Sequence, residues 1–132
     1  MFHVTVKDRI LIAHSLNSEV FGPAQHLHGA TFEVEVTFAS TNLGANNIVI
    51  DMGYAHQILH NSLTRYNYKN LDEIEALKQQ LTTTEYLSKR IWDDIVKLLK
   101  ESNQAVKHIR RLKVVLNESL VASAGFEDGI VW

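Results

Sequence analysis

Three histidines in the first part of the chain have the spacing of a metal site. From His26 to Phe38, apolar and polar side chains alternate, which predicts a half-buried strand with His26 and His28 on its mostly apolar face. Same-face side chains on a strand recur about every 6.5–7 Å, so two imidazoles can lean together around one ion. A tetrahedral Zn²⁺ accepts such nitrogens at ~2.0–2.1 Å. A single buried histidine, however, is more often a hydrogen-bonded core residue than a ligand.

The third histidine ends the segment that precedes this strand. Residues 2–14 alternate in the same way, with Asp8 as the one break, and His14 closes their apolar face. A short loop over residues 17–25 contains the only proline, so we expect the two strands to pair antiparallel. This pairing would bring His14 towards His26 and His28. Three histidines on adjacent strands favour Zn²⁺ more strongly than any one of them.

A carboxylate near the C-terminus gives a second chemical signal. Glu118 continues the apolar face of a strand predicted over residues 112–116. Burying a carboxylate is costly unless a charged or multiply hydrogen-bonding group meets it. One interpretation is a salt bridge to Arg110, Arg111 or another chain. The other is a ligand with a guanidine-like edge, as in pterins and guanines, which two carboxylate oxygens can bind through parallel hydrogen bonds.

Two helices are predicted between the strands that carry these groups. Asp51 is a plausible N-cap for residues 52–66, where apolar side chains recur at helical spacing. His56 and His60 are four residues apart on this helix, but no third ligand accompanies them, which favours a solvated face. The sequence from Thr82 to Glu85 has the pattern of a capping box that begins the second helix.

The order of elements predicts a single α+β domain over residues 1–132. Strand, strand, helix, helix, strand and strand follow one another, without an internal repeat or a linker. We expect a four-stranded antiparallel sheet in ββααββ order with two helices on one face. Such a small sheet leaves two edges that need cover, and a ring-like homo-oligomer is one solution.

Composition narrows the classes of function. The chain has 132 residues and a formal net charge of −2, and its largest basic cluster is the pair Arg110-Arg111, so we expect no nucleic-acid partner. It has no long apolar run and no signal-peptide pattern, from which we expect no membrane association and a cytoplasmic location. The absence of cysteine excludes disulfides, thiolate metal ligands and a cysteine nucleophile.

Several short stretches resemble the 6-pyruvoyltetrahydropterin synthase / 6-carboxytetrahydropterin synthase family, in the family's order. They are Ile12–Leu16, Leu27–Val36, Ile50–Gly53, Lys69–Leu71, Thr83–Glu85 and Leu116–Ser119. The resemblance implies the tunnelling fold, in which trimers close a continuous β-barrel and pair into a hexamer with sites between subunits. It also implies that Glu118 anchors a pterin, with Thr83 and Thr84 near the same ring.

The chain departs from the family at positions that matter for chemistry. The family holds zinc with a histidine matching His14 and both histidines of a His-Gly-His motif, which here reads His28-Gly29-Ala30. The family's catalytic cysteine corresponds to Ala24, and its Asp-His pair corresponds to Asn67-Tyr68. An alanine accepts no proton and a neutral amide is a poor base, so the family reaction cannot follow the family route.

Two functions are consistent with these residues. The first is a zinc-dependent lyase or isomerase acting on the side chain of a reduced pterin or a related purine-like compound. His26, Tyr66 or Tyr68 would then transfer protons, unless His26 is instead the third zinc ligand beside His14 and His28. The second is a protein that binds a pterin or purine without catalysis. In both cases we expect a homohexamer built as a dimer of trimers.

Overall fold

The computed structural model describes residues 1–132 and is built on a five-stranded sheet in the order β3-β1-β2-β4-β5. The long strands β1 (Phe2–His14) and β2 (His28–Ser40) pair antiparallel from end to end. Strand β4 (Arg111–Asn117) pairs antiparallel with β2, and β5 (Ser123–Gly129) pairs antiparallel with β4. The predicted α+β class is therefore confirmed. The sheet has five strands, whereas we predicted four.

The additional strand, β3 (Lys69–Asn70), pairs parallel with β1 and is not among the strands predicted from the sequence. Two hydrogen bonds extend this contact: the Tyr68 amide donates to the Leu11 carbonyl over 2.7 Å, and the Leu11 amide donates to Asn67 Oδ1 over 2.9 Å. A strand of two residues is too short to show periodicity, which is why sequence analysis missed it.

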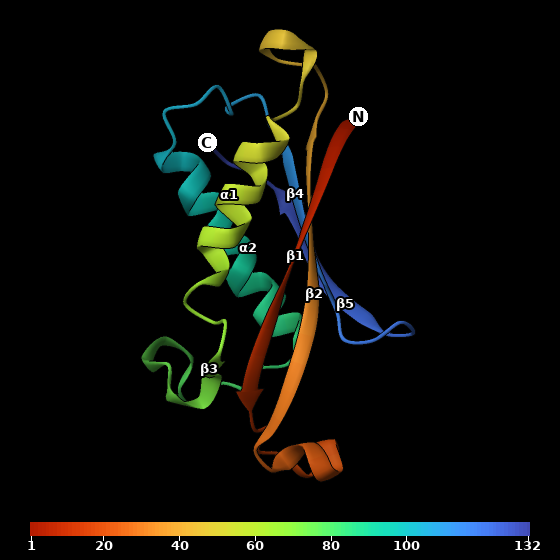
Figure 1. The fold of residues 1–132 in the computed structure, drawn as a ribbon, viewed down its shortest axis with the longest axis vertical. Helices are drawn as coiled ribbons and strands as arrows, with labels where there is room; N and C mark the ends of the chain where they lie inside the picture. The colour runs from red at the N-terminus through yellow and green to blue at the C-terminus, as the bar shows by residue number, and fades with distance from the viewer.

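Helices α1 (Met52–Leu63) and α2 (Thr84–Glu101) cover one face of the sheet (Figure 1). Asp51 caps α1 as predicted, because its carboxylate accepts from the Tyr54 amide over 2.8 Å. Thr83 is the N-cap of α2. The predicted capping box, which began at Thr82, therefore starts one residue too early. Four short 3₁₀ helices complete the chain: η1 (Glu19–Gln25), η2 (Ala45–Asn47), η3 (Leu71–Glu73) and η4 (Glu75–Leu77).

The core lies between the sheet and the two helices. The alternation in β1 and β2 is confirmed, since Ile10, Phe32 and Val34 point into the core and are almost completely buried. Trp92 of α2 adds a polar link to the sheet by donating from its indole nitrogen to the Leu112 carbonyl over 2.9 Å. The same alternation carries the buried face of β1 to its last residue, His14, which is 4% exposed.

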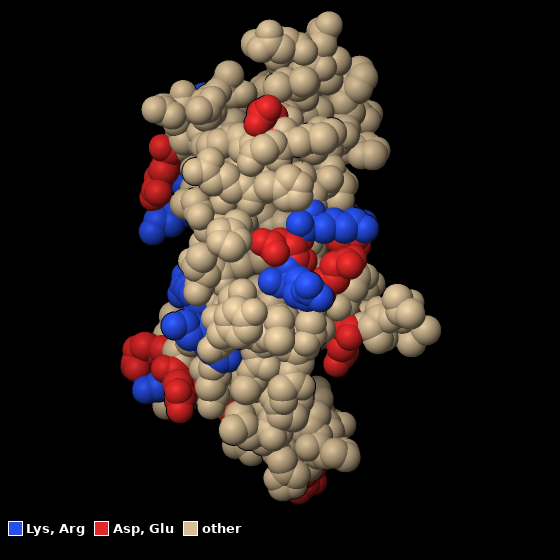
Figure 2. All heavy atoms as spheres, viewed as in Figure 1, with Lys and Arg blue, Asp and Glu red and all other residues tan.

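The two ends of the molecule differ in what flanks the sheet. Helix η1 and strand β3 lie at one end and η2 at the other (Figure 1). On the face drawn in Figure 2, acidic and basic side chains lie beside one another, and no extended patch of one sign is visible. Neither helix combines the length and the apolar character needed to cross a membrane.

Candidate functional site

His14 and His28 form a close pair where β1 ends and β2 begins. They are direct cross-strand partners, their ring centroids are 4.6 Å apart, and the rings meet edge to face at 61°. His14 is buried and His28 is half-buried. The structure therefore brings together two of the three histidines singled out from the sequence.

The Nδ1 atom of each ring is already occupied by a hydrogen bond. His28 Nδ1 lies 2.8 Å from the backbone carbonyl of His26, and His14 Nδ1 lies 2.9 Å from the Thr82 hydroxyl. A carbonyl can only accept, so His28 carries its proton on Nδ1 and keeps a free lone pair on Nε2. Hydrogen bonds of this kind are how proteins orient metal-binding imidazoles.

The surroundings of His14 keep its ring neutral. Burial is the main reason that the pKa of His14 lies below its ordinary value of 6.5, and the neighbouring His28 lowers it further. Asp72, the backbone of Thr82 and the charge of Glu118 act in the opposite direction without reversing the shift. A neutral imidazole is the form that binds a metal.

His26 does not join the pair as a ligand, so the predicted three-histidine site within one chain is wrong. Strand β2 begins only at His28; His26 ends η1 and its side chain is exposed. The tight turn is made by Gly22, with φ of 52°, and by the His26 amide donating to the Pro23 carbonyl over 3.2 Å. The alternation therefore cannot be extended back to His26.

The donors present suit part of a zinc site. No group of three or more His, Cys, Asp or Glu side chains in the chain could hold a metal ion. His14 and His28 can supply two nitrogens, so tetrahedral zinc at this position would need two further ligands from solvent, substrate or another subunit.

The two tyrosine candidates for proton transfer have different surroundings. Tyr66 is fully buried, and its hydroxyl donates to Asp94 of α2. Burial and Asp94 raise the pKa of Tyr66 far above its ordinary value, so we reassign it from proton transfer to the core. Tyr68 is 78% exposed beside the outer edge of β1 and has a left-handed backbone with φ of 59°. Its hydroxyl is accessible.

Glu118 lies in the turn between β4 and β5. Strand β4 ends at Asn117, so the Glu118 side chain is exposed and not on the buried face that we predicted. The salt bridge considered from the sequence is also not formed, because Arg111 pairs with Glu127 over 3.0 Å and Glu118 makes no ion pair within the chain. Its charge is the smallest of the effects that oppose the lowering of the His14 pKa.

The segment between β3 and α2 lines a cavity of about 370 Å³ together with Ser15 and Asn17, and neither His14 nor His28 lines it. Asp72 fixes one side of it by accepting from the Ser15 amide over 3.0 Å and from the Ser15 hydroxyl over 2.6 Å. Leu77 to Leu81 line the other side, next to Thr82. Sequence analysis missed Asp72 and the contact of Thr82 with His14, because both depend on contacts distant in sequence.

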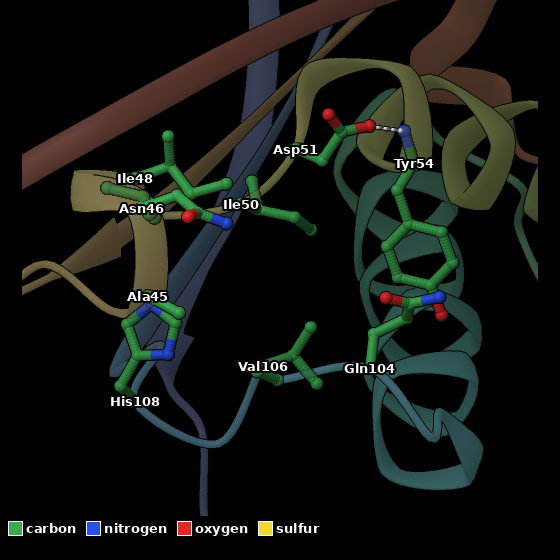
Figure 3. Close-up of a pocket in the computed structure, with 11 residues that line it drawn as sticks. Ala45, Asn46, Ile48, Ile50, Asp51, Tyr54, Gln104, Val106 and His108 are labelled. Carbon is green, nitrogen blue, oxygen red and sulfur yellow. Dashed lines mark hydrogen bonds between the residues drawn. The ribbon is translucent and has the colours of Figure 1, made fainter.

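A second cavity, of about 230 Å³, lies at the other end of the sheet (Figure 3). It is lined by residues 45–46, 48–51, 104–106 and 108 together with Tyr54. His108 faces it, and its Nε2 is buried without a hydrogen-bond partner. None of the residues proposed from the sequence for metal or pterin binding lines this cavity.

Comparison with known proteins identifies the family. A family model described as 6-pyruvoyl tetrahydropterin synthase matches residues 3–128, almost the whole chain. The chain belongs to this family. A curated relative, the 6-carboxy-5,6,7,8-tetrahydropterin synthase of Bacillus subtilis, is 26% identical over 98 residues, which are 71% of this chain and 65% of that enzyme. The chain thus spans slightly less than two thirds of this relative.

Solved structures of family members share the fold. The 6-pyruvoyl tetrahydropterin synthase of Caenorhabditis elegans superposes with a TM-score of 0.77 at 20% identity and covers 97% of both chains. The enzyme of Plasmodium vivax gives the same TM-score of 0.77 at 14% identity and covers 98% of both chains. At these identities the likeness shows the fold alone.

Ala24 stands where the family resemblance implies a cysteine. Ala24 is half-buried in η1, and its carbonyl accepts from the Leu16 amide over 3.0 Å. Asn67 stands where the resemblance implies an aspartate, and its side-chain oxygen accepts a hydrogen bond from the Leu11 amide of β1. Ala24 and Asn67 therefore each accept a hydrogen bond from a backbone amide at the η1 end of the sheet, and neither side chain can act as a base.

Proposed function

We propose that this family member is a zinc-dependent lyase or isomerase acting on the side chain of a reduced pterin or a related purine-like compound. The observation that carries the proposal is the pair His14 and His28, held 4.6 Å apart between ring centroids with Nδ1 of each ring occupied. Zinc, when bound by these residues, supplies Lewis-acid polarisation of oxygens on the substrate side chain.

Ligand recognition is assigned to Glu118. Its exposed carboxylate has no ion-pair partner in the chain and is close enough to act on the pKa of His14. Two carboxylate oxygens can accept parallel hydrogen bonds from the guanidine-like edge of a pterin. Thr83 and Thr84, at the start of α2, are proposed near the same ring, as the family resemblance suggests.

Proton transfer is assigned to His26 or Tyr68, both of which have exposed side chains near the ends of the long strands. His26 is adjacent in sequence to the turn that leads into His28, and Tyr68 is hydrogen-bonded through its amide to Leu11 of β1. A positioned imidazole or phenol can serve as a general acid or base.

The second candidate function is binding without catalysis. Ala24 and Asn67 favour it, because neither side chain can take a proton at the positions where the resemblance implied a cysteine and an aspartate. In that case Glu118 and the histidine pair would retain a pterin or purine without converting it.

We also propose a homohexamer arranged as a dimer of trimers. Strand β5 is at one edge of the sheet with no strand beyond it, and β3 covers only Ile12 and Ala13 at the other edge. Leu120 and Val121 project from the β4–β5 turn and are almost fully exposed. Open edges and exposed apolar side chains are typical of surfaces that pair with other subunits. A stable monomer in sedimentation at micromolar concentration would contradict this assembly.

The decisive experiment combines turnover and binding. The protein would be assayed with dihydroneopterin triphosphate, its monophosphate and dihydroneopterin, and neopterin binding would be measured by calorimetry for the parent and Glu118→Gln. Turnover of any of the three supports the enzyme, whereas neopterin binding without turnover supports the second function.

The variant tests the anchor separately. Replacing one acceptor oxygen of Glu118 with an NH₂ group should weaken neopterin binding by about 2–3 kcal/mol, the worth of a charge-assisted hydrogen bond. Glu101→Gln, at the exposed end of α2, is the matched control and should bind like the parent. Unchanged affinity in Glu118→Gln would exclude the anchor role.

A further inference from the structure

The cavity of about 370 Å³ lies next to His14 along the chain, although His14 does not line it. Ser15, on one wall, directly follows His14. Leu81, on the other wall, directly precedes Thr82, whose hydroxyl lies 2.9 Å from Nδ1 of His14. Strand β3 and the segment that follows it lie beside the end of β1 (Figure 1). The cavity is therefore at the η1 end of the sheet.

Contacts with the rest of the fold fix both walls of this cavity. Asp72 accepts from the Ser15 amide over 3.0 Å and from the Ser15 hydroxyl over 2.6 Å. Leu77 is buried in the core, and its carbonyl accepts from the Gln80 amide over 3.1 Å. Gln79, between them, has a left-handed backbone with φ of 66°, which a residue other than glycine keeps only where its surroundings impose it. The turn that carries the two glutamines is therefore held in place.

Most of the polar side chains that line the cavity are neutral. They are the hydroxyl of Ser15 and the carboxamides of Asn17, Gln79 and Gln80. A carboxamide offers both donors and an acceptor, and the Ser15 hydroxyl, which donates to Asp72, can still accept. Hydroxyl groups of a ligand need this mixture, because each of them donates one hydrogen bond and accepts others.

The charged groups of the lining do not suit a phosphorylated ligand. They are one carboxylate, Asp72, and one ammonium, Lys78, so their charges cancel. Asp72 already binds Ser15, and Lys78 pairs with Glu75 over 2.9 Å. Proteins bind phosphate groups with arginine and lysine side chains or with a free helix N-terminus.

The N-terminus of α2, which begins just after the second wall, does not replace the missing cations. The Thr83 hydroxyl already accepts from the Tyr86 amide over 3.1 Å, and Glu85 places a carboxylate in the first turn. That carboxylate occupies the position where a helix favours a negative charge, and it would repel a phosphate. A phosphorylated chain would therefore lose hydration at this cavity without meeting a compensating charge.

The anchor proposed for the ligand ring lies at the same end of the sheet. The first residue of β4 pairs with Ala39 of β2, and the last residue of β4, Asn117, pairs with Glu33. Strand β4 therefore runs towards the beginning of β2, where His28 pairs with the end of β1. Glu118 directly follows Asn117. A ring bound at Glu118 is thus at the end of the sheet that holds the cavity.

We propose that this cavity receives the side chain of the ligand, and that this side chain is a neutral polyol without phosphate groups. The inference rests on the function proposed above, in which Glu118 binds the ring of a pterin or a related compound. It applies equally to an enzyme and to a binding protein. The hydroxyl and the carboxamides of the lining select the polyol by exchanging hydrogen bonds with it.

The first test compares three ligands by calorimetry with the full chain. Pterin has no side chain, neopterin has a trihydroxypropyl chain, and neopterin triphosphate has that chain phosphorylated. Neopterin should bind about tenfold more tightly than pterin, the worth of one or two net hydrogen bonds. The triphosphate should bind more weakly than neopterin. An affinity for the triphosphate equal to or above that for neopterin would overturn the inference.

The second test adds a cation to the cavity. Gln80→Lys should bind neopterin triphosphate about tenfold or more tightly than the parent does, because it supplies a charge-assisted hydrogen bond, and it should bind pterin as the parent does. Gln57→Lys makes the same exchange at an exposed position of α1 and is the matched control, which should bind all three ligands like the parent. A gain of affinity cannot result from misfolding. Unchanged affinity for the triphosphate in Gln80→Lys would show that the chain does not enter this cavity.

The outcomes separate this inference from the proposed function. If pterin does not bind to the parent, the proposed function and this inference are both wrong. If pterin binds to the parent and more weakly to Glu118→Gln, but neopterin binds no more tightly than pterin, the ring anchor stands and the role of the cavity is overturned.

Discussion

Both ends of the sheet carry histidine rings, but hydrogen bonds orient the rings at only one end. At the η1 end, Nδ1 of His14 contacts the Thr82 hydroxyl and Nδ1 of His28 contacts a carbonyl, so that both rings are oriented. At the η2 end, His108 packs against Gly44, where an added Cβ would lie 2.7 Å from the ring. Its Nε2 is buried without a partner.

The other polar groups reinforce this difference. At the η2 end, Asp51 caps α1 by accepting from the Tyr54 amide (Figure 3). The Tyr54 hydroxyl lies 2.5 Å from that of Ser102, so these groups hold the fold together. At the η1 end, Asp72 and Thr82 hold the last residue of β1 and the residue after it, and the side chain of Glu118 is unpaired. A cavity with polar walls becomes a candidate site when its chemically active groups are oriented and still free to bind.

The largest expected effect tests this comparison directly. His14→Ala and His28→Ala should each reduce zinc affinity by more than the roughly 10–100-fold expected for loss of an outer-shell partner, because each removes a proposed ligand. His108→Ala should retain the zinc content of the parent. Bound zinc per subunit would be measured by plasma mass spectrometry after purification without chelator. Equal loss in all three variants would break the distinction between the two ends.

The next prediction separates a buried polar group that supports the core from the groups that we assign to binding. Tyr66→Phe leaves Asp94 without the hydroxyl that donates to it, although Arg65 still pairs with Asp94 over 3.0 Å. We expect a loss of about 1.5–3 kcal/mol in the free energy of unfolding, the range for a hydrogen bond to a charged group. Urea denaturation measures this loss, and zinc affinity should not change. A selective loss of zinc or of turnover with normal stability would return Tyr66 to the site.

Local patterns predicted much of the fold and the close approach of His14 and His28. Alternation placed His14 and His28 on the buried face because side-chain direction in a strand depends only on residue parity. The Asp51 cap was predictable because it depends on contacts three residues apart. The family resemblance, carried by short stretches in order, is confirmed by a match to residues 3–128.

The predictions that failed depend on where a pattern stops or on contacts between distant segments. His26 shares the parity of His28, but η1 ends there and the strand has not begun. Glu118 shares the parity of β4, but the strand ends at Asn117. Thr82 contacts a residue 68 positions away, and no local pattern can report such a contact.

A smaller effect is expected at the η2 end, where Asp51 supports the fold. Asp51→Ala should reduce the free energy of unfolding by about 1 kcal/mol, the usual cost of losing an N-cap side chain. Asp51→Asn keeps an oxygen that can accept from the Tyr54 amide and should recover most of the stability. Both variants should bind zinc as the parent does. A loss of zinc on capping mutations would show that the two ends are coupled through α1.

The smallest effect is expected midway along the sheet, at Glu35, which is remote from both ends. Its carboxylate accepts from the Asn117 side chain over 2.9 Å and from Lys7 over 3.1 Å. The hydrogen bond from Asn117, followed by that from Lys7, lowers the pKa of Glu35 below its ordinary value of 4.5. The unfolded chain therefore binds a proton at this position at a higher pH than the folded chain does. The stabilisation from ionised Glu35 is complete above the unfolded-state pKa and is lost as the pH falls through the folded-state pKa.

Glu35→Gln removes this titration and provides the measurement. The parent should exceed the variant in stability at neutral pH, and the two denaturation curves should converge as the pH falls below about 4.5, the ordinary value for this carboxyl. Added salt should reduce the difference at neutral pH, since Lys7 and Glu35 lie on the open face of the sheet. Zinc affinity should be the same in both proteins at every pH. A difference in stability that persisted unchanged into strong acid would mean that the charge of Glu35 is not its cause. A change in zinc affinity would mean that the open face communicates with the histidine end.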